Sequence, residues 1–218
     1  MKHIVVSGGE ADPGFVRDFL AGHPGAKIIA ADRGLHVLDE IGTVPDLILG
    51  DYDSAGRELV SRYEKAGVPT EHYHAEKDFT DTEAAVRKAV EEKSEGIFLL
   101  GAAGGRLDHF LANVQILLIP LKKKIPAEID DPQNRILLLD APLRIRKEEA
   151  FGKYVSLLPF SEKVTGITLT GFRYPLENYT LARGGTVGVS NEIQSKTAGI
   201  SFTGGILMLI MSKDREEK

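Results

Sequence analysis

Short apolar runs alternate with longer amphipathic stretches through the first 142 residues of the chain. The runs are rich in Ile, Val and Leu and end in Gly, Asp or Ser, which is typical of buried parallel strands. Such alternation predicts a parallel sheet with crossover helices. We expect strands at 4–6, 28–31, 47–49, 97–100 and 136–139, and helices near 13–22, 34–41, 55–67, 80–94 and 107–119.

The helical periodicity disappears after residue 142, where short strand-like runs are separated by Gly, Pro and Asn. This spacing predicts an antiparallel sandwich or a small barrel. The runs lie at 153–159, 166–170, 180–183, 186–189, 198–202 and 206–212. We therefore expect α/β plus all-β architecture, with a Rossmann-like domain at residues 1–142 followed by a β-sandwich at residues 143–218.

Two carboxylates, Asp51 and Asp53, stand two residues apart directly after the third predicted strand. In extended backbone this spacing sends both side chains to the same side. Two such close like charges are tolerable if a cation neutralises them, and Mg²⁺ typically takes one or two protein carboxylates. The alternative is a polar turn in which Asp53 or Ser54 caps the following helix.

A second acidic group surrounds the start of the predicted helix at 80–94. Thr80 and Glu83 match a capping box, with Thr80 at the N-cap and Glu83 reaching back, so we treat Glu83 as structural. Capping explains Asp78 and Asp81 less well, although the helix dipole also favours acidic residues at this end. Both carboxylates therefore stay candidates for the site at the carboxyl ends of the strands, where open α/β sheets bind ligands.

A glycine-rich turn joins the strand at 97–100 to the next helix and contains Gly104, Gly105, Arg106 and Asp108. Glycines let the backbone approach phosphate oxygens, and the helix start supplies oriented N–H groups. The turn matches neither a Walker A loop nor the dinucleotide pattern, while Arg106 offers a fork suited to phosphate. The alternative is a tight turn in which Asp108 caps the helix or pairs with Arg106.

Composition excludes several classes of site. The net charge of −5 argues against broad binding of nucleic acid, which needs clustered Lys and Arg. There is no cysteine, so disulfides and Cys-ligated zinc are excluded. His109 lacks a second His nearby and is interpreted as structural. The apolar runs are too short for a signal peptide or a membrane span, so we expect a soluble, cytoplasmic protein.

Taken together, the motifs resemble the thiamine pyrophosphokinase family, and the bacterial members in particular. They occur in the family's order along nearly the whole chain. The matching blocks are 31–34, 45–46, 50–54, 77–83, 101–109, 111–113, 174–176 and 190–192.

The resemblance implies transfer of the pyrophosphoryl group of ATP to the hydroxyl of thiamine, giving thiamine diphosphate and AMP. It also implies a homodimer whose active site lies at the subunit interface, between the nucleotide domain of one chain and the sandwich of the other. Asp78 belongs to the same motif, and our own hypothesis is that a carboxylate of this cluster, with Asp78 as the candidate, accepts the hydroxyl proton. The remaining implied roles are Mg²⁺ on Asp51, Asp53 and Asp81; ATP on Asp32, Thr80, Gly104, Gly105, Arg106 and Asp108; and thiamine on Ser190 and Asn191.

The chain departs from the family pattern in two places. Tyr52 stands where phenylalanine is common, and there is no tryptophan, which some members place near thiamine. Tyr174, Tyr179 and Phe202 are the candidates for the missing ring contact. Two other functions remain as alternatives, a pyrophosphokinase for another hydroxymethyl heterocycle such as a pterin, and a nucleotide or thiamine sensor without turnover.

Overall fold

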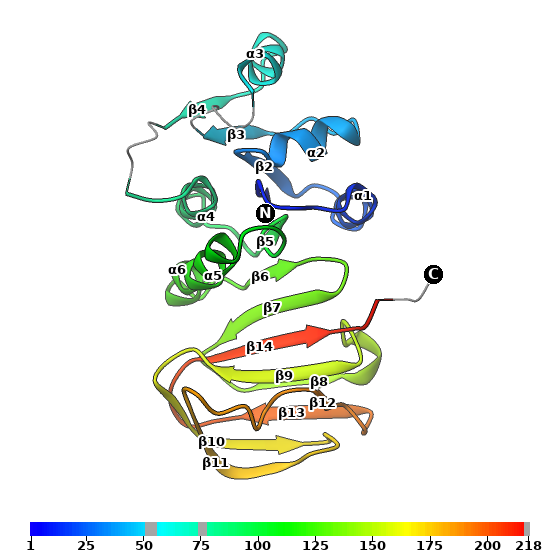
Figure 1. The fold of residues 1–218 in the computed structure, drawn as a ribbon, viewed down its shortest axis with the longest axis vertical. Coiled ribbons are helices and arrows are strands. Elements are labelled where there is room, and N and C mark those ends of the chain that lie inside the picture. Colours follow the sequence, from blue (N-terminus) through cyan, green and yellow to red (C-terminus); the bar gives the residue numbers. More distant parts are fainter. Residues whose placement is uncertain (51–55, 74–77, 216–218) are drawn as a thin grey trace. The chain divides into compact units, whose positions relative to one another are not determined.

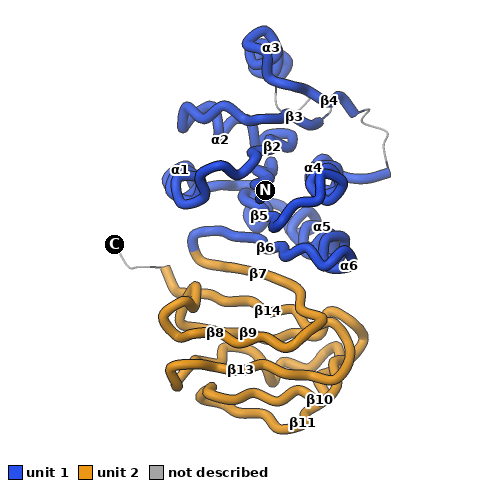
Figure 2. Tube along the Cα trace, turned by 180° about the vertical axis from the view of Figure 1, so that it is seen from behind, with its two compact units in different colours: residues 1–132 blue, residues 133–218 orange. Residues whose placement is uncertain are grey.

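The structure is a computed structural model that describes residues 1–50, 56–73 and 78–215. The chain forms two compact units, Met1–Pro132 and Gln133–Lys218 (Figure 2). The first unit is an α/β layer structure, and the second consists of antiparallel sheets. The predicted combination of an α/β region and an antiparallel β region is confirmed.

The first unit is built on a parallel sheet with the strand order β6-β5-β1-β2-β3-β4. Its strands are β1 (His3–Val6), β2 (Lys27–Ala31), β3 (Leu47–Gly50), β4 (Thr70–His72), β5 (Ile97–Leu100) and β6 (Ala127–Asp130). The chain runs outward from β1 to β4 and then returns to β5 on the other side of β1. The strand order therefore reverses between β1 and β5, and such a switch point opens a crevice at the carboxyl ends of the strands.

Helices cover both faces of this sheet, with α1 and α2 on one side and α4, α5 and α6 on the other (Figure 1). The helices of the unit are α1 (Pro13–Ala21), α2 (Gly34–Glu40), α3 (Arg57–Lys65), α4 (Asp81–Glu91), α5 (Leu107–Ile116) and α6 (Leu118–Lys122). Burial on both faces explains why every residue of β1 and β3 is buried and why, apart from His3 at the start of β1, these strands carry no polar side chain.

The predicted capping of α4 is confirmed in its first half. The Thr80 hydroxyl accepts a hydrogen bond from the Glu83 backbone N–H at 3.1 Å. The Glu83 carboxylate bonds the guanidinium of Arg87, one turn along the helix, at 2.6 and 2.8 Å. Thr80 therefore fixes the start of α4, and with it the position of Asp81.

The second unit contains two antiparallel sheets, ordered β12-β9-β14-β7 and β11-β10-β13-β8. The strands are β7 (Asn134–Leu139), β8 (Leu143–Arg146), β9 (Tyr154–Pro159), β10 (Lys163–Thr170), β11 (Leu176–Ala182), β12 (Asn191–Glu192), β13 (Thr197–Ser201) and β14 (Leu207–Ser212). A short 3-10 helix, η1 (Lys147–Glu149), follows β8. Inward residues of both sheets share one core, which includes Val155, Leu157, Ile167, Ile200 and Leu209.

Two of the predicted strands are wrong: one pairs antiparallel where we expected a parallel strand, and the other is not a strand. The run at 136–139, expected in the parallel sheet, lies in β7 and pairs antiparallel with β14 in the second unit. Only alternate residues of this run are buried, as in a sheet with one covered face. The run at 186–189 forms turns, because the backbone of Gly188 packs on Leu157 and the flanking Val187 and Val189 are exposed.

Within the described ranges, no helix is long and apolar enough to cross a membrane. The helix α5, for example, is rich in apolar residues but is only ten residues long, and it packs against α4.

Candidate active site

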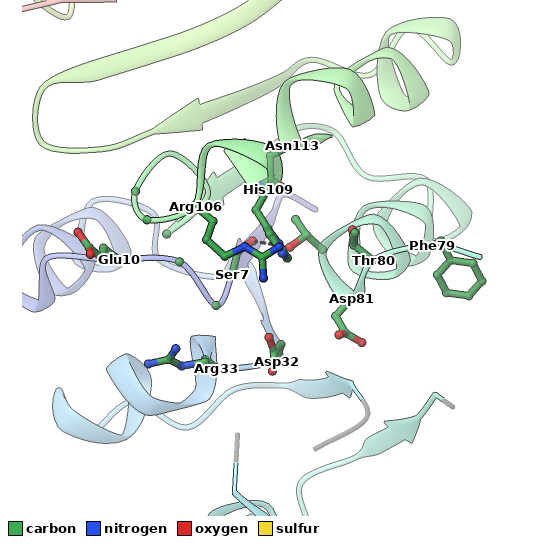
Figure 3. A pocket seen from close by; sticks show the side chains of 16 residues that line it. Ser7, Glu10, Asp32, Arg33, Phe79, Thr80, Asp81, Arg106, His109 and Asn113 are labelled. Carbon is green, nitrogen blue, oxygen red and sulfur yellow. Dashed lines mark hydrogen bonds between the residues drawn. The ribbon is translucent and has the colours of Figure 1, made fainter. Parts of the chain in front are cut away.

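A pocket of the first unit lies at the switch point of its sheet (Figure 3). Its volume is about 550 Å³, within the usual range for a small-molecule site. The loops after β1 and β5 form its floor, and the starts of α4 and α5 form its walls. The lining residues are Ser7, Gly8, Gly9, Glu10, Asp32, Arg33, Phe79, Thr80, Asp81, Thr82, Gly101, Gly104, Gly105, Arg106, His109 and Asn113.

The floor of the pocket requires glycine at the points where the loop after β1 packs directly on the loop after β5. A Cβ on Gly9 would lie 2.4 Å from the Gly101 carbonyl oxygen and 2.8 Å from that of Gly104. A Cβ on Gly104 would in turn lie 2.7 Å from the Glu10 carbonyl oxygen. The Asn113 amide donates to the Ala102 carbonyl at 2.8 Å and holds the second loop to α5. Together these contacts leave backbone exposed toward the pocket, as a phosphate cradle requires.

Asp32 and Asp81 form the acidic side of the pocket, from two different elements (Figure 3). Asp32 adopts the left-handed backbone region with φ of 53°, and its N–H donates to the Leu49 carbonyl at 2.9 Å. Its carboxylate lies 2.9 Å from where a Cβ on Gly8 would be. The Asp81 carboxylate lies 3.5 Å from the equivalent position on Gly50, at the end of β3.

Asp51 and Asp53 lie outside the described residues, directly after Gly50. Since Asp81 is placed beside Gly50, the carboxylate from α4 stands next to the point where these two residues begin. Asp78 is described and exposed, and it lies outside the set of residues that line the pocket. The structure therefore brings Asp32, Asp81 and Thr80 together.

Arg106 and Asp108 form an exposed bidentate ion pair at the start of α5. The guanidinium hydrogen bond, supported by the His109 backbone N–H at 2.9 Å, lowers the pKa of the Asp108 carboxyl to about 2. Arg106 lines the pocket and points into it (Figure 3), and Asp108, its ion-pair partner, is not among the lining residues. Asp108 therefore holds and orients a cation at the pocket edge.

Sequence reasoning missed several lining residues that have no motif of their own. Ser7 and Thr82 are buried, and the Thr82 hydroxyl donates to the Ser7 hydroxyl at 3.1 Å, joining the ends of β1 and α4. His109, which we interpreted as structural, lines the pocket next to Arg106. For Ser7 the only available signal was its position at the end of the first strand.

In the second unit, Ser190 is the last residue of the turn that leads into β12, and Asn191 is the first residue of that strand. Ser190 has a left-handed φ of 57°, and its N–H donates to the Ser156 hydroxyl at 2.9 Å. The Asn191 side chain is buried, with 4% exposed, and its amide pairs with the backbone of Tyr174 at 2.7 and 3.0 Å.

Comparison with known proteins assigns the chain to a family. Residues 25–129 match the model of the thiamin pyrophosphokinase catalytic domain, and residues 142–207 match that of the vitamin B1 binding domain. The chain is 39% identical over 187 residues to thiamine pyrophosphokinase of Bacillus subtilis, covering 85% of this chain and 87% of that protein.

Solved structures agree with this assignment over the full length. The crystal structure of thiamine pyrophosphokinase from Bacillus subtilis superposes with a TM-score of 0.87 at 35% identity, covering 99% of this chain and 100% of the other. The thiamin pyrophosphokinase of Geobacillus thermodenitrificans gives 0.84 at 37% identity, with 99% of each chain covered. The predicted resemblance is confirmed, and the chain belongs to the thiamine pyrophosphokinase family.

Proposed function

We propose that this protein is an ATP-dependent diphosphotransferase that converts thiamine and ATP into thiamine diphosphate and AMP. Family membership supports this reaction, and the site itself supports it through one observation. The switch-point pocket combines a glycine-lined floor, a cationic fork on Arg106 and the carboxylates Asp32 and Asp81. These three features together suit a polyphosphate with a bound cation.

ATP would occupy this pocket. Backbone N–H groups at Gly104 and Gly105 would approach the phosphates, and Arg106, oriented by Asp108, would pair with their oxygens. Asp32 and Thr80 would position the nucleotide from the neighbouring strand and helix ends. Most of the catalytic effect in such a transfer comes from positioning and charge neutralisation.

Asp51, Asp53 and Asp81 would hold Mg²⁺. The donor set fits, because hard oxygen ligands suit this ion and the Asp81 carboxylate stands at the end of β3, where the chain continues to Asp51. Within the described residues there is no group of three or more potential ligands, so the proposed site depends on Asp51 and Asp53. When bound, the ion would neutralise phosphate charge and help align the reacting groups.

The thiamine hydroxyl oxygen would attack the β-phosphorus of ATP. A new O–P bond forms, the bond between the β-phosphorus and the bridging oxygen to the α-phosphate breaks, and AMP leaves with that oxygen. Asp78 would accept the hydroxyl proton, a role consistent with its exposed carboxylate two residues before Thr80. Arg106 would offset charge that develops on the phosphate oxygens.

Ser190 and Asn191 of the second unit would form part of the thiamine site. We further propose a cytoplasmic homodimer in which the first unit of one subunit and the second unit of its partner complete each active site. The two units match separate catalytic and vitamin B1 binding domain models, which supports a division of labour between them.

Product analysis tests the proposal directly. The purified protein is incubated with ATP, Mg²⁺ and thiamine, and the mixture is separated by chromatography. We expect AMP and thiamine diphosphate in equal amounts. ADP in place of AMP would mean attack at the γ-phosphorus and would refute the mechanism. Turnover of a pterin-like alcohol but not of thiamine would refute the substrate, and thiamine binding without any product would indicate a sensor.

A further inference from the structure

Buried polar side chains join the α4 region to the β1 region at both ends of the helix. The first contact, which we call the near pair, lies at the pocket: the Thr82 hydroxyl donates to the Ser7 hydroxyl at 3.1 Å. The second contact, the far pair, lies at the other end of α4, where His3 Nδ1 and the Ser94 hydroxyl are 2.9 Å apart. In the described part of the first unit, the buried polar residues are His3, Ser7, Thr82, Ser94, Asn113 and Asp130. Both pairs are thus made of side chains withdrawn from water, where a lost hydrogen bond is costly.

The face that α4 turns toward the sheet consists mostly of small side chains. Its buried residues are Thr82, Ala84, Ala85, Val86 and Ala89. The helix packs through this face on β1, β2 and β3. Apolar contact is non-directional, and alanines give a helix surface with shallow ridges, so a small shift along the helix axis costs little. A hydrogen bond weakens steeply with length and angle, so the near pair fixes how far the first turn of α4 extends toward the pocket.

The N-cap of α4 does not replace this contact. The Thr80 hydroxyl accepts from the Glu83 N–H, so the cap bond stays within the helix and sets the shape of its first turn. Ser7 belongs to the centre of the sheet, because it follows β1 and its N–H donates to the Leu100 carbonyl at 2.8 Å. The near pair therefore places the first turn relative to the sheet, which the cap alone cannot do.

The first turn carries Asp81 directly before Thr82. The Asp81 carboxylate lies 3.5 Å from where a Cβ on Gly50 would be, at the end of β3. Mg²⁺ requires near-octahedral ligands at about 2.0–2.1 Å, so a shift of a few tenths of an ångström between Asp81 and the end of β3 would weaken its binding.

We propose that Thr82 is a positioning residue for Asp81. Through its hydrogen bond to Ser7 it holds the Asp81 carboxylate at the distance from the end of β3 that Mg²⁺ binding needs. This inference rests on the proposed function, which makes Asp81 a metal ligand. Thr82 itself has no contact with the metal in this role, since its hydroxyl hydrogen is engaged by Ser7.

Matched substitutions at Thr82 separate positioning from packing. Thr82→Val keeps the size of the side chain and removes the donor, while Thr82→Ser keeps the hydroxyl and removes a methyl group. Ser7→Ala breaks the same hydrogen bond from the other side, and the double variant Ser7→Ala, Thr82→Val completes a cycle. The control is Ser94→Ala, which removes a buried hydroxyl of the far pair and leaves the bonds of Glu92 to His3 and Lys27 in place.

For each variant we measure the rate as a function of Mg²⁺ concentration, the KM for thiamine, and the melting temperature. The affinity for Mn²⁺ alone, followed by electron paramagnetic resonance, reports on the metal site without turnover. Thr82→Val and Ser7→Ala should each raise the half-saturating Mg²⁺ concentration and the Kd for Mn²⁺ about tenfold, the lower end of the range for outer-shell partners of a metal site. The KM for thiamine should stay unchanged.

Thr82→Ser and Ser94→Ala should stay within about twofold of wild type in both metal measurements. Both should lower the melting temperature, because one loses a buried methyl group and the other a buried hydroxyl. The metal requirement should therefore follow the Thr82 hydroxyl and not the melting temperature. The double variant should be no worse than the more impaired single variant, since either substitution already breaks the bond.

Three results would overturn the proposal. These are a wild-type Mg²⁺ requirement in Thr82→Val, equal impairment in Thr82→Ser and Thr82→Val, and a loss of metal affinity in Ser94→Ala as large as that in Thr82→Val. If Thr82→Val does not fold, Ser7→Ala decides the same question. Additive losses in the double variant would show that Ser7 and Thr82 act independently, which would also refute the mechanism.

The Mn²⁺ measurement separates this proposal from the proposed function. A wild-type protein that binds Mn²⁺ but makes no thiamine diphosphate would refute the reaction, while the metal affinities would still decide the role of Thr82. A wild-type protein that makes thiamine diphosphate but does not bind Mn²⁺ would leave the reaction standing and overturn the positioning role.

Discussion

At the scale of single residues, the pocket edge is held by the exposed ion pair between Arg106 and Asp108. Exposed pairs of this kind add little to folding stability, because water screens them. Their value here is orientation, since Asp108 holds the guanidinium at the start of α5, where it lines the pocket. An incoming phosphate would compete with Asp108 for the N–H donors of the Arg106 guanidinium. On binding, Arg106 would therefore either share its donors between Asp108 and the phosphate or exchange one partner for the other.

The titration of Asp108 tests this pairing. Its carboxyl pKa is lowered to about 2 by Arg106, so the pair stays ionised across neutral and mildly acidic pH and breaks only as the pH falls toward 2. In Arg106→Gln we expect the Asp108 pKa to rise toward its usual value near 3.8. NMR titration of the carboxyl carbon measures the shift. An unchanged pKa in Arg106→Gln would show that the backbone N–H of His109 alone sets the value.

A second residue-scale prediction concerns the proposed metal ligand Asp81. Asp81→Asn should lower kcat about a hundredfold or more, because an amide replaces an anionic ligand of Mg²⁺ at a site built for charge. Asp53→Asn should have a similar effect. The melting temperature should change little, since the Thr80 cap that starts α4 is retained.

Glu83→Gln is the matched control, because Glu83 lies in the same turn of α4 and bonds Arg87 outside the pocket. Its steady-state rate should stay within about twofold of wild type. Near-normal activity in Asp81→Asn, at every Mg²⁺ concentration tried, would contradict the ligand assignment.

At the scale of elements, α4 runs from the candidate site to the amino-terminal ends of β1 and β2, on the opposite side of the strands. Its first turn carries Thr80 and Asp81, and its C-terminal cap is Glu92. The Glu92 carboxylate accepts from His3 Nε2 at 2.9 Å and from Lys27 at 2.7 and 2.8 Å, which ties the helix end to β1 and β2. This network fixes the helix whose other end carries Asp81, the proposed Mg²⁺ ligand.

The pH dependence of stability should reflect this network. The Lys27 and His3 hydrogen bonds lower the pKa of Glu92, so its contribution is present above the unfolded value near 4.5 and is lost as the pH falls below it. Glu92→Gln should reduce the free energy of unfolding by about 1 kcal/mol at pH 7, after allowance for solvent screening. Urea denaturation at pH 7 and pH 4 measures the difference, which should shrink at the lower pH.

Glu91→Gln provides the comparison, because Glu91 is the exposed neighbour of Glu92 on the same helix end. It should show a much smaller change at pH 7 and little dependence on pH. Equal effects of the two substitutions would indicate a general charge effect and not the specific network at Glu92.

The same elements show what the pattern of residues could and could not predict. Strands β1, β2, β3 and β5 are buried and apolar, so their composition indicated both their existence and their parallel pairing. The edge strand β4 has the polar sequence Thr-Glu-His and lies half-exposed, which left no apolar run to find. The strand β7 was mistaken for a parallel strand because its leucines are consecutive although only alternate residues are buried.

The sequence predicted those site residues whose side chains stand where a strand ends or the following helix begins. Asp32, Asp81 and Arg106 were all expected in one crevice, and they line one pocket. Ser7 and Glu10 were missed because their place in the pocket comes from the packing of two backbone loops. Asn191 was named as a site candidate, but the pairing of its amide with the Tyr174 backbone was not predicted, since the two residues are 17 apart in the sequence.

At the scale of the whole molecule, the question is how many chains make one active site. We propose that each site combines the first unit of one subunit with the second unit of its partner. Light scattering should then give twice the chain mass of 23.8 kDa. This arrangement also makes a prediction about mixed dimers, because isologous dimers contain two equivalent sites.

Subunits with defects in different units should restore each other's activity. One chain carries Asp81→Asn in the first unit, and the other carries the Tyr174→Leu, Asn191→Ala pair in the second. Each mixed dimer then has one intact site and one doubly defective site, so random exchange should recover about a quarter of wild-type activity at low thiamine concentration. Mixing Asp81→Asn with Arg106→Gln should restore no activity. Both substitutions lie in the first unit, so every site in the mixed dimer contains one altered first unit. If a single chain supplied both units of its own site, the first mixture would be as inactive as the second.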